Sequence, residues 1–268
     1  MPTQAMNDSP AVADPHVVTT TGDGVLRIEI RRPEKKNALT TGMYSAMTAA
    51  LAFADRAPAV RVVFLHGQPG VFTSGNDLKD FLDDPALDDD HVAYRFVRTL
   101  AGTAKPIVAA VNGACVGVGA TLLLHCDLVY AGQGATFALP FVNLGLCPEA
   151  GSSLLLPLAA GHARAAELLL LGEPFGAVRA ASCGMVSDVL PDEAVLAHAE
   201  ERARRLAAKP PAALRLTKAL MRRGMHAQVQ EAIAVESREF QQRLQSPEAK
   251  EAFAAFLEKR KPDYSRFG

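Results

Sequence analysis

Glu149 is a solitary carboxylate between two apolar segments, PFVNLGLC before it and SSLLLPLAA after it. Apolar surroundings disfavour the charged form of a carboxyl group, which raises its pKa and suits it to accept and return a proton. The alternative is an ordinary glutamate in the first turn of a helix, where the helix dipole favours negative charge. The residues around Glu149 leave these two interpretations equally open.

Two glycine-rich turns each precede a predicted helix. The first reads SGNDL, from Ser74 to Leu78, and the second reads NGACVGVG and directly follows the apolar run IVAAV. Backbone N–H groups at a helix start have no intrahelical partner and lie at the positive end of the dipole, so such turns can hold a developing negative charge. Two turns that face each other can supply two donors to one oxygen. The alternative is a pair of tight strand-to-helix connections without a chemical role.

Other chemistries find little support. A dinucleotide-binding GxGxxG would need a third glycine where Leu122 stands, and the P-loop and the GxSxG elbow are absent. The histidines are scattered singly and the acidic stretch at 80–90 lacks the spacing of a calcium loop, so no metal site is expected. With 28 Lys and Arg against 29 Asp and Glu, a general nucleic-acid binder is disfavoured.

The pattern of elements predicts an α/β fold. Residues 25–31 alternate as a half-exposed strand, a helix capped by Thr40 or Thr41 runs to about residue 56, and RVVFLH is a strand followed by a loop at 67–75. A short helix at 91–102, a strand at 107–111, a helix at 117–126 and a strand at 128–131 follow. Strands that alternate with helices favour a largely parallel sheet with helices covering it.

The ends of the chain differ from this pattern. Residues 1–15 are predicted to be a disordered tail, residues 16–205 the core, and residues 206–268 a helical region. Beyond residue 191 only helices are expected, at 192–208, 212–223, 229–244 and 247–260. The uncharged stretch 107–124 is broken by glycines and is interpreted as buried α/β core, so no membrane span is expected. Four cysteines without CxxC spacing favour a cytoplasmic location.

Three motifs carry a family resemblance. SGNDL, then NGACVGVGATLLLHCDLVYA, then FALPFVNLGLCPEAGSS resemble the enoyl-CoA hydratase/isomerase (crotonase) superfamily from about residue 17 onward, and most of all its peroxisomal-type Δ3,Δ2-enoyl-CoA isomerases. The resemblance implies a crotonase-like spiral of repeated ββα units with a C-terminal helical trimerisation region. It also implies a homotrimer or hexamer and an acyl-CoA substrate, whose coenzyme A is part of the substrate rather than a separate cofactor.

The resemblance also implies roles for individual residues. The backbone N–H groups of Asn76 and Val118 would bind the thioester carbonyl oxygen, and Glu149 would be the catalytic acid/base. The residues that would line the coenzyme and acyl groove are Lys36, Asn37, Ala38, Leu39, Ser74, Gly75, Asp77, Leu78, Gly117, Thr121, Phe141 and Leu144. Lys259 and Lys261 would reach the coenzyme phosphates across a subunit boundary, unless they only complement the dipole of the last helix.

A departure from the hydratase pattern favours one reaction. The two glutamates that position water in typical hydratases correspond to Thr121 and Phe141 here, which cannot do that work. A double-bond shift needs one base that removes the C2 proton of a 3-enoyl thioester and returns a proton at C4. Two oxyanion donors could lower the barrier by roughly 5–8 kcal/mol in all. Phe141 would then be part of a dry wall that suppresses hydration.

Two alternatives to the isomerase hypothesis stay open at this point. The first is a hydratase or another enolate-forming enzyme on the same scaffold. The second is a non-catalytic family member that binds acyl-CoA or a partner subunit. A pyridine-nucleotide enzyme is a more distant alternative.

Overall fold

The computed structural model describes residues 14–79 and 91–267. The predicted disordered tail at 1–15 lies outside the described residues except for its last two positions, and the acidic stretch at 80–90 lies entirely outside them. All four cysteines are free thiols.

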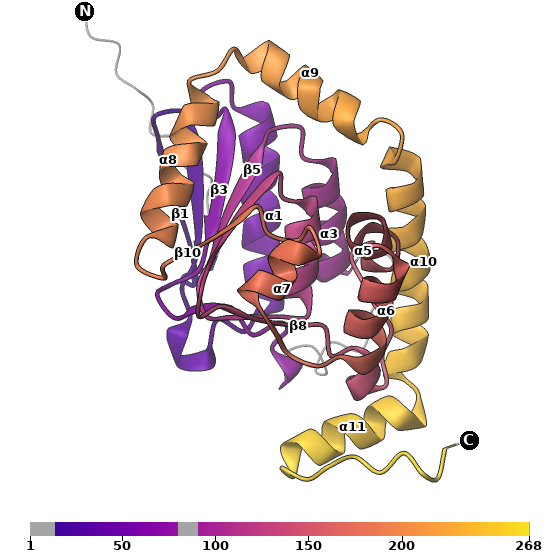
Figure 1. Cartoon of the computed structure of the whole chain (residues 1–268). Coiled ribbons are helices and arrows are strands. Elements are labelled where there is room, and N and C mark those ends of the chain that lie inside the picture. Colours follow the sequence, from indigo (N-terminus) through magenta and orange to yellow (C-terminus); the bar gives the residue numbers. More distant parts are fainter. Residues whose placement is uncertain (1–13, 80–90, 268) are drawn as a thin grey trace, which may run out of the picture.

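A six-stranded sheet forms the centre of the molecule (Figure 1). Its order is β1-β2-β3-β5-β7-β10, and all neighbours are parallel except β1 and β2. Parallel strands covered on both faces are expected to be continuously apolar, as the fully buried IVAAV of β5 is. The strand bounds are β1 Val17–Gly22, β2 Val25–Ile30, β3 Val62–His66, β5 Ile107–Val111, β7 Leu128–Gly132 and β10 Asp188–Leu190.

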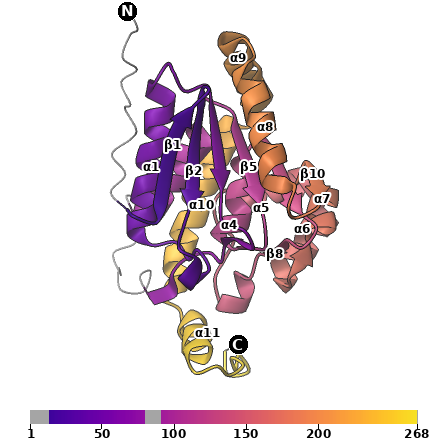
Figure 2. The ribbon, with the colours of Figure 1, turned by 90° about the vertical axis from the view of Figure 1, so that its left-hand side faces the viewer.

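Helices cover both faces of this sheet, and Figure 2 shows it between α1 and α8. Helices α1 (Thr41–Arg56) and α3 (Val92–Gly102) pack together on one face, while α8 (Val195–Ala207) packs on the other. The Thr40 side chain caps α1 by accepting the Met43 N–H, as predicted. The small buried residues Ala199 and Ala203 bring α8 close to the strands. The predicted core boundary at residue 205 therefore falls inside a helix that packs on the sheet.

A second, smaller sheet was missed by the sequence interpretation. It has the order β4-β6-β8-β9, with bounds β4 Val71–Thr73, β6 Ala114–Val116, β8 Thr136–Ala138 and β9 Phe175–Gly176. The predictions of a loop throughout 67–75 and of a turn throughout 112–119 are wrong at β4 and β6. Strands of three residues are too short to show an alternating pattern, and their pairing with neighbours stabilises them.

The helix predicted at 117–126 is also shorter than expected. It is α4 (Val118–Thr121) followed by the 3₁₀ helix η2 (Leu122–His125). Two further 3₁₀ helices are η1 (Pro33–Lys35) and η3 (Val142–Leu144).

The C-terminal part is helical, as predicted. Helix α9 (Pro211–Arg222) crosses from α8 to α10 (His226–Leu244), which runs beside α3 and α5 and leads to α11 (Pro247–Leu257) (Figure 1). Helices α5 (Ser152–Ala160), α6 (His162–Leu171) and α7 (Ala177–Ser182) come between β8 and β10 in the sequence. Among the described residues, we find no helix with the length and apolar character needed to span a bilayer.

Candidate active site

The two glycine turns lie side by side because they follow neighbouring parallel strands, β4 and β6. A Cβ atom added to Gly75, whose φ is +94°, would lie 3.0 Å from the Val116 carbonyl oxygen. A Cβ atom added to Gly119 would lie 2.4 Å from Thr73 Cγ2. Glycine at these two positions therefore lets the backbones of the two turns approach closely.

Hydrogen bonds from the preceding segment fix the first turn. Leu39 N–H donates to the Gly75 carbonyl at 2.8 Å, and Asp77 N–H donates to the Leu39 carbonyl at 2.9 Å. Gly75 N–H donates to Thr73 Oγ1 at 3.1 Å. Within the part of the chain that the structure describes, Asn76 N–H, between these groups, donates to no protein acceptor. The first predicted oxyanion donor is thus held in a fixed turn and left unpaired.

The second turn has the same character. Gly117, at φ +56°, donates its N–H to the Ala138 carbonyl at 2.9 Å, and its carbonyl accepts from the N–H groups of Ala120 and Thr121. The N–H of Val118, the first residue of α4, has no acceptor among residues 14–79 and 91–267. The two predicted donors therefore belong to two adjacent turns.

Glu149 lies beside the second turn. Its carboxylate accepts a hydrogen bond from the hydroxyl of Thr121, which is fully buried and one helical turn beyond Val118. Burial raises the pKa of Glu149 to about 7, the Thr121 hydrogen bond lowers it, and the negative charge of Glu236 raises it. Because α5 begins only at Ser152, Glu149 does not lie in the first turn of a helix. The interpretation as a proton acceptor and donor is the one that this geometry supports.

Tyr44 is a member of the site that the sequence interpretation missed. Its hydroxyl donates to Asn76 Oδ1, and its ring packs 5.5 Å from that of Phe96. Burial raises the pKa of Tyr44 well above its ordinary value, and the negative charge of Glu149 raises it further. Helix α1 therefore contributes a side chain that binds the first turn and interacts electrostatically with the carboxylate. In the sequence Tyr44 could not be distinguished from the other buried residues of its helix.

The bend that follows Glu149 has two buried anchors, His125 and Glu236, which the sequence interpretation also missed. Ala150 and Gly151 both have left-handed backbone, with φ of +61° and +72°. His125 Nε2 lies 2.7 Å from the Ala150 carbonyl, and burial lowers the pKa of His125 to about 4, so its neutral ring donates this bond. Glu236 accepts the Gly151 N–H at 2.5 Å. Nothing in the local sequence signals a partner 85 residues away.

The segment predicted to line the coenzyme groove lies against the first turn. Lys36 is exposed and Ala38 is half-buried, whereas Asn37 is completely buried. Asn37 Oδ1 accepts the Arg32 N–H at 2.6 Å, and its Nδ2 donates to the Phe72 carbonyl at 3.0 Å. The Asn37 side chain therefore holds the segment together from inside, and ligand contact by the segment stays a prediction.

The other predicted groove residues fall into two groups. Asp77 is half-buried and pairs with Arg32 at 2.7 Å, while Leu78 and Leu144 pack on the main core. Phe141 is 5% exposed and belongs to that core. Lys259 and Lys261 are exposed beyond the end of α11, and their side chains form no ion pair among the described residues, so their phosphate role stays a prediction.

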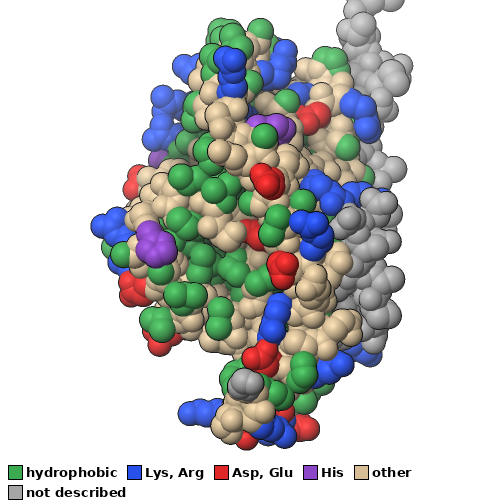
Figure 3. Space-filling model, turned by 90° about the vertical axis from the view of Figure 1, so that its right-hand side faces the viewer, with side chains coloured by type: hydrophobic (Ala, Val, Ile, Leu, Met, Phe, Trp, Pro, Cys, Tyr) green, Lys and Arg blue, Asp and Glu red, His purple; other side chains and the backbone are tan. Residues whose placement is uncertain are grey.

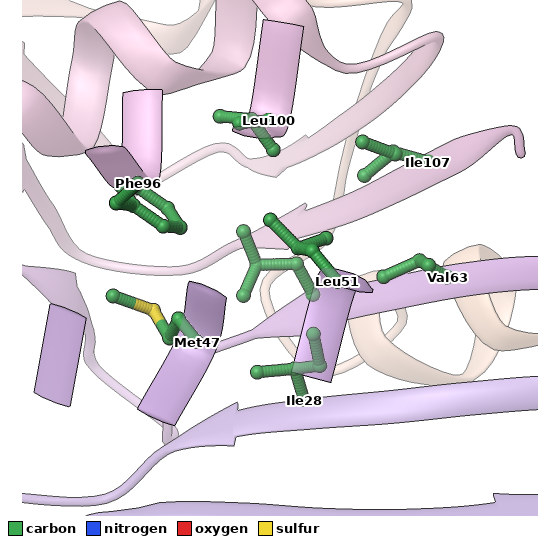
Figure 4. Close-up of a pocket in the computed structure, with 8 residues that line it drawn as sticks. Ile28, Met47, Leu51, Val63, Phe96, Leu100 and Ile107 are labelled. Atoms are coloured by element: carbon green, nitrogen blue, oxygen red, sulfur yellow. The ribbon is translucent and has the colours of Figure 1, made fainter. Parts of the chain in front are cut away.

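Two cavities lined by described residues lie away from Glu149. Figure 4 shows one of about 10 Å³ between α1, α3 and the central sheet, lined only by apolar side chains, which is a packing gap barely the size of a water molecule. Another, of about 480 Å³, lies between the end of α3 and α9 and has Arg215, Arg223 and His226 among its lining residues. Neither contains Glu149. The described residues include no group of three or more side chains arranged to hold a metal ion.

The arrangement defines a class of chemistry. Two unpaired backbone donors from adjacent turns can hold one oxygen that gains negative charge, and a carboxyl group with a pKa of about 7 can move a proton on a neighbouring carbon. These are the requirements for forming an enolate from a thioester.

Comparison with known proteins agrees with this class. The family model described as enoyl-CoA hydratase/isomerase matches residues 20–266. The chain is 35% identical to human enoyl-CoA delta isomerase 2, over 91% of this chain and 64% of that protein. It is 32% identical to 2,3-dehydroadipyl-CoA hydratase of Escherichia coli K12, over 90% of this chain and 94% of that protein.

A solved structure agrees as well. The crystal structure of enoyl-CoA hydratase/isomerase from Pseudoalteromonas atlantica T6c matches with a TM-score of 0.88 and 40% identity, over 92% of this chain and 99% of that one. The chain belongs to the enoyl-CoA hydratase/isomerase family, and the predicted crotonase-like fold is confirmed. Relatives named isomerase and relatives named hydratase both match, so the family alone does not select the reaction.

Proposed function

We propose that this protein is an enoyl-CoA isomerase that moves a C3 double bond of an acyl-CoA thioester to C2. The observation that carries the proposal is that Glu149 binds Thr121 beside the second of two adjacent turns, whose Asn76 and Val118 N–H groups have no acceptor among the described residues. At the two positions where hydratases of the family are expected to carry glutamates, this chain has Thr121 and Phe141. The hydroxyl of Thr121 is already engaged with Glu149, and Phe141 has no polar side-chain atom.

The proposed reaction needs one base and one oxyanion site. The N–H groups of Asn76 and Val118 bind the thioester carbonyl oxygen, and the Glu149 carboxylate removes the C2 proton. The electron pair of the C2–H bond forms the C1=C2 bond of a dienolate, whose negative charge is shared by the oxygen and C4. The protonated Glu149 then donates its proton at C4, and the C2=C3 bond forms. No water is consumed.

The ionisation of Glu149 suits both steps. A base removes a proton only when ionised, and an acid returns it only when protonated, so a pKa near the working pH serves both. Burial, which raises the pKa of Glu149 to about 7, therefore supports a role in moving a proton in both directions. Thr121, which favours the ionised form, keeps the carboxylate available as the base.

Turnover of two thioesters tests the proposal. The protein is expected to convert 3-hexenoyl-CoA to 2-hexenoyl-CoA, a reaction that is monitored through the absorbance of the conjugated product. It is expected to hydrate 2-hexenoyl-CoA poorly. Efficient hydration of 2-hexenoyl-CoA would replace this proposal with a hydratase. Binding of either thioester without turnover would point to a non-catalytic acyl-CoA-binding protein.

A homotrimer or hexamer is part of the proposal. Figure 3 shows apolar side chains gathered across the middle of the face on the right-hand side of Figure 1. Large apolar side chains are exposed on several helices of the second half of the chain, among them Leu158, Leu170, Leu171, Val235 and Phe256. Exposed apolar surface of this kind supports a protein interface. Light scattering after size-exclusion chromatography tests it, and a monomer would contradict it.

A further inference from the structure

Glu236 is a buried carboxylate with no cationic partner in the part of the chain that the structure describes. It lies on α10, is 6% exposed, and forms no salt bridge among the described residues. Instead it accepts the Gly151 N–H at 2.5 Å, the Ser153 N–H at 2.9 Å and the Ser153 hydroxyl. Burial raises the pKa of Glu236, and the hydrogen bonds from Ser153 and Gly151 oppose that shift. Because all three partners donate, the geometry suits the ionised, acceptor-only form of the carboxylate.

The segment that Glu236 holds is the strained bend after Glu149. Ala150 has φ of +61°, a conformation that residues with a side chain rarely adopt, and Gly151 follows at +72°. Such strain persists only where the surroundings fix it. His125 holds the Ala150 carbonyl at 2.7 Å, and Glu236 holds the N–H groups on the other side of the bend. The bend sets the direction in which the Glu149 side chain leaves the backbone.

A capping role alone does not require a charge at this position. A neutral oxygen could accept the free N–H groups at the start of α5, whereas a buried carboxylate without a cation carries a large desolvation cost. The charge of Glu236 acts on Glu149, since it raises the pKa of that carboxyl group. Within residues 14–79 and 91–267, the other groups known to act on Glu149 are Thr121 from α4, by a hydrogen bond, and Tyr44 from α1, through the electrostatic interaction of the two groups.

We propose that Glu236 is a positioning residue that fixes the Ala150-Gly151 bend and places a buried carboxylate against the segment that carries Glu149. This inference rests on the proposed acid/base role of Glu149. By this inference, helix α10 supports the segment that carries Glu149, although α10 lies far along the chain and belongs to neither glycine turn.

Three variants test the inference. Glu236→Gln removes the charge and keeps the shape, Glu236→Asp keeps the charge and shortens the reach, and Glu231→Gln removes an exposed charge from the same helix as a control. The titration of Glu149 is followed by ¹³C NMR of glutamate-labelled protein, with its signal assigned by its loss in Glu149→Gln. The kcat and KM for 3-hexenoyl-CoA are measured across pH.

In Glu236→Gln, Glu149 is expected to titrate at lower pH, with the acid limb of the kcat profile moving the same way. The kcat is expected to fall on the order of 10- to 100-fold, because a misplacement of about 1 Å can cost that much, with a smaller change in KM. In Glu236→Asp, kcat is expected to fall while the Glu149 titration stays near that of the wild type. Glu231→Gln should match the wild type in all three measurements.

Unchanged Glu149 titration and unchanged kcat in Glu236→Gln would overturn the inference. Should that variant fail to fold, wild-type kcat in Glu236→Asp would overturn it instead. Absence of isomerase turnover in the wild type would contradict the proposed function, whereas the NMR titration would still test the influence of Glu236 on Glu149.

Discussion

The two halves of the candidate site are built differently. The oxyanion half consists of backbone N–H groups in turns that leave adjacent strands, and its supports, Leu39 and Thr73, lie within or beside those strands. The acid/base half is one side chain, Glu149, held by side chains of η2, α4 and α10. The oxyanion half should therefore lose its function when the backbone is changed. The acid/base half should respond to changes of charge and polarity.

A backbone change in the oxyanion half is expected to have the largest effect. Gly75→Ala would place a methyl group 3.0 Å from the Val116 carbonyl in a residue with φ of +94°. Displacing the Asn76 donor should lower kcat/KM for 3-hexenoyl-CoA by about 10²–10³-fold, since the loss of one oxyanion donor costs that much. Gly70→Ala, also in left-handed backbone but with nothing within 4 Å of the added atom, is the control. Equal activity of the two variants would contradict the role of this turn.

Removing the internal support of the first turn should chiefly reduce stability. Asn37→Ala would leave the Arg32 N–H and the Phe72 carbonyl without their buried partner. We expect the free energy of unfolding to fall by about 2–3 kcal/mol, as measured by urea denaturation. Lys35→Ala, an exposed change nearby, should alter it by less than about 0.5 kcal/mol. If Asn37→Ala lowered the free energy of unfolding by no more than Lys35→Ala does, the hydrogen bonds of the Asn37 side chain would be shown to be replaceable.

The acid/base half should be a source of instability at high pH. Burial raises the pKa of Glu149 from 4.5 to about 7 in the folded state, so the folded protein binds more protons than the unfolded chain between these values. Stability should therefore fall as the pH rises through this window, and Glu149→Gln should avoid that loss. Between pH 5 and pH 8, the free energy of unfolding of Glu149→Gln should rise relative to that of the wild type by on the order of 1–3 kcal/mol, as measured by thermal denaturation. If the free energies of unfolding of the two proteins differed by the same amount at every pH, the raised pKa of Glu149 would be contradicted.

The smallest effect is expected from the hydroxyl that donates to Glu149. Thr121→Val removes a bond that lowers the pKa of Glu149, so that pKa should rise further. The acid limb of the kcat/KM profile, expected near pH 7 in the wild type, should move to higher pH. At pH 7 the activity should fall by about threefold to tenfold, and at pH 9 by less. Thr136→Val, on an exposed position of β8, should leave the profile unchanged.

The same contrast explains what the sequence could predict. The strands β2, β3, β5 and β7, the cap at Thr40 and the four C-terminal helices were predictable because apolar periodicity and capping are local signals. The strands β1 and β10 of the same sheet were not predicted. The strands β4 and β6 were not, since three residues give no periodicity. They are stabilised by pairing with each other and, for β6, with β8.

The site follows the same rule. The glycine turns were visible because a glycine marks a backbone position, and Glu149 was visible because it is a lone charge among apolar residues. Tyr44, His125 and Glu236 reach the site from other elements, and a buried tyrosine or glutamate on a helix has no local pattern that reveals its partner. The resemblance to the family identified the motifs, whereas the side chains around them required the fold.

The most direct test of the account is the isomerisation of 3-hexenoyl-CoA by Glu149→Gln, measured together with binding of the same thioester by titration calorimetry. In this variant kcat is expected to fall by about 10²–10⁴-fold, the range for loss of a general acid/base, while the dissociation constant changes little, since the backbone donors remain. A variant that binds the thioester and isomerises it at the wild-type rate would contradict the account.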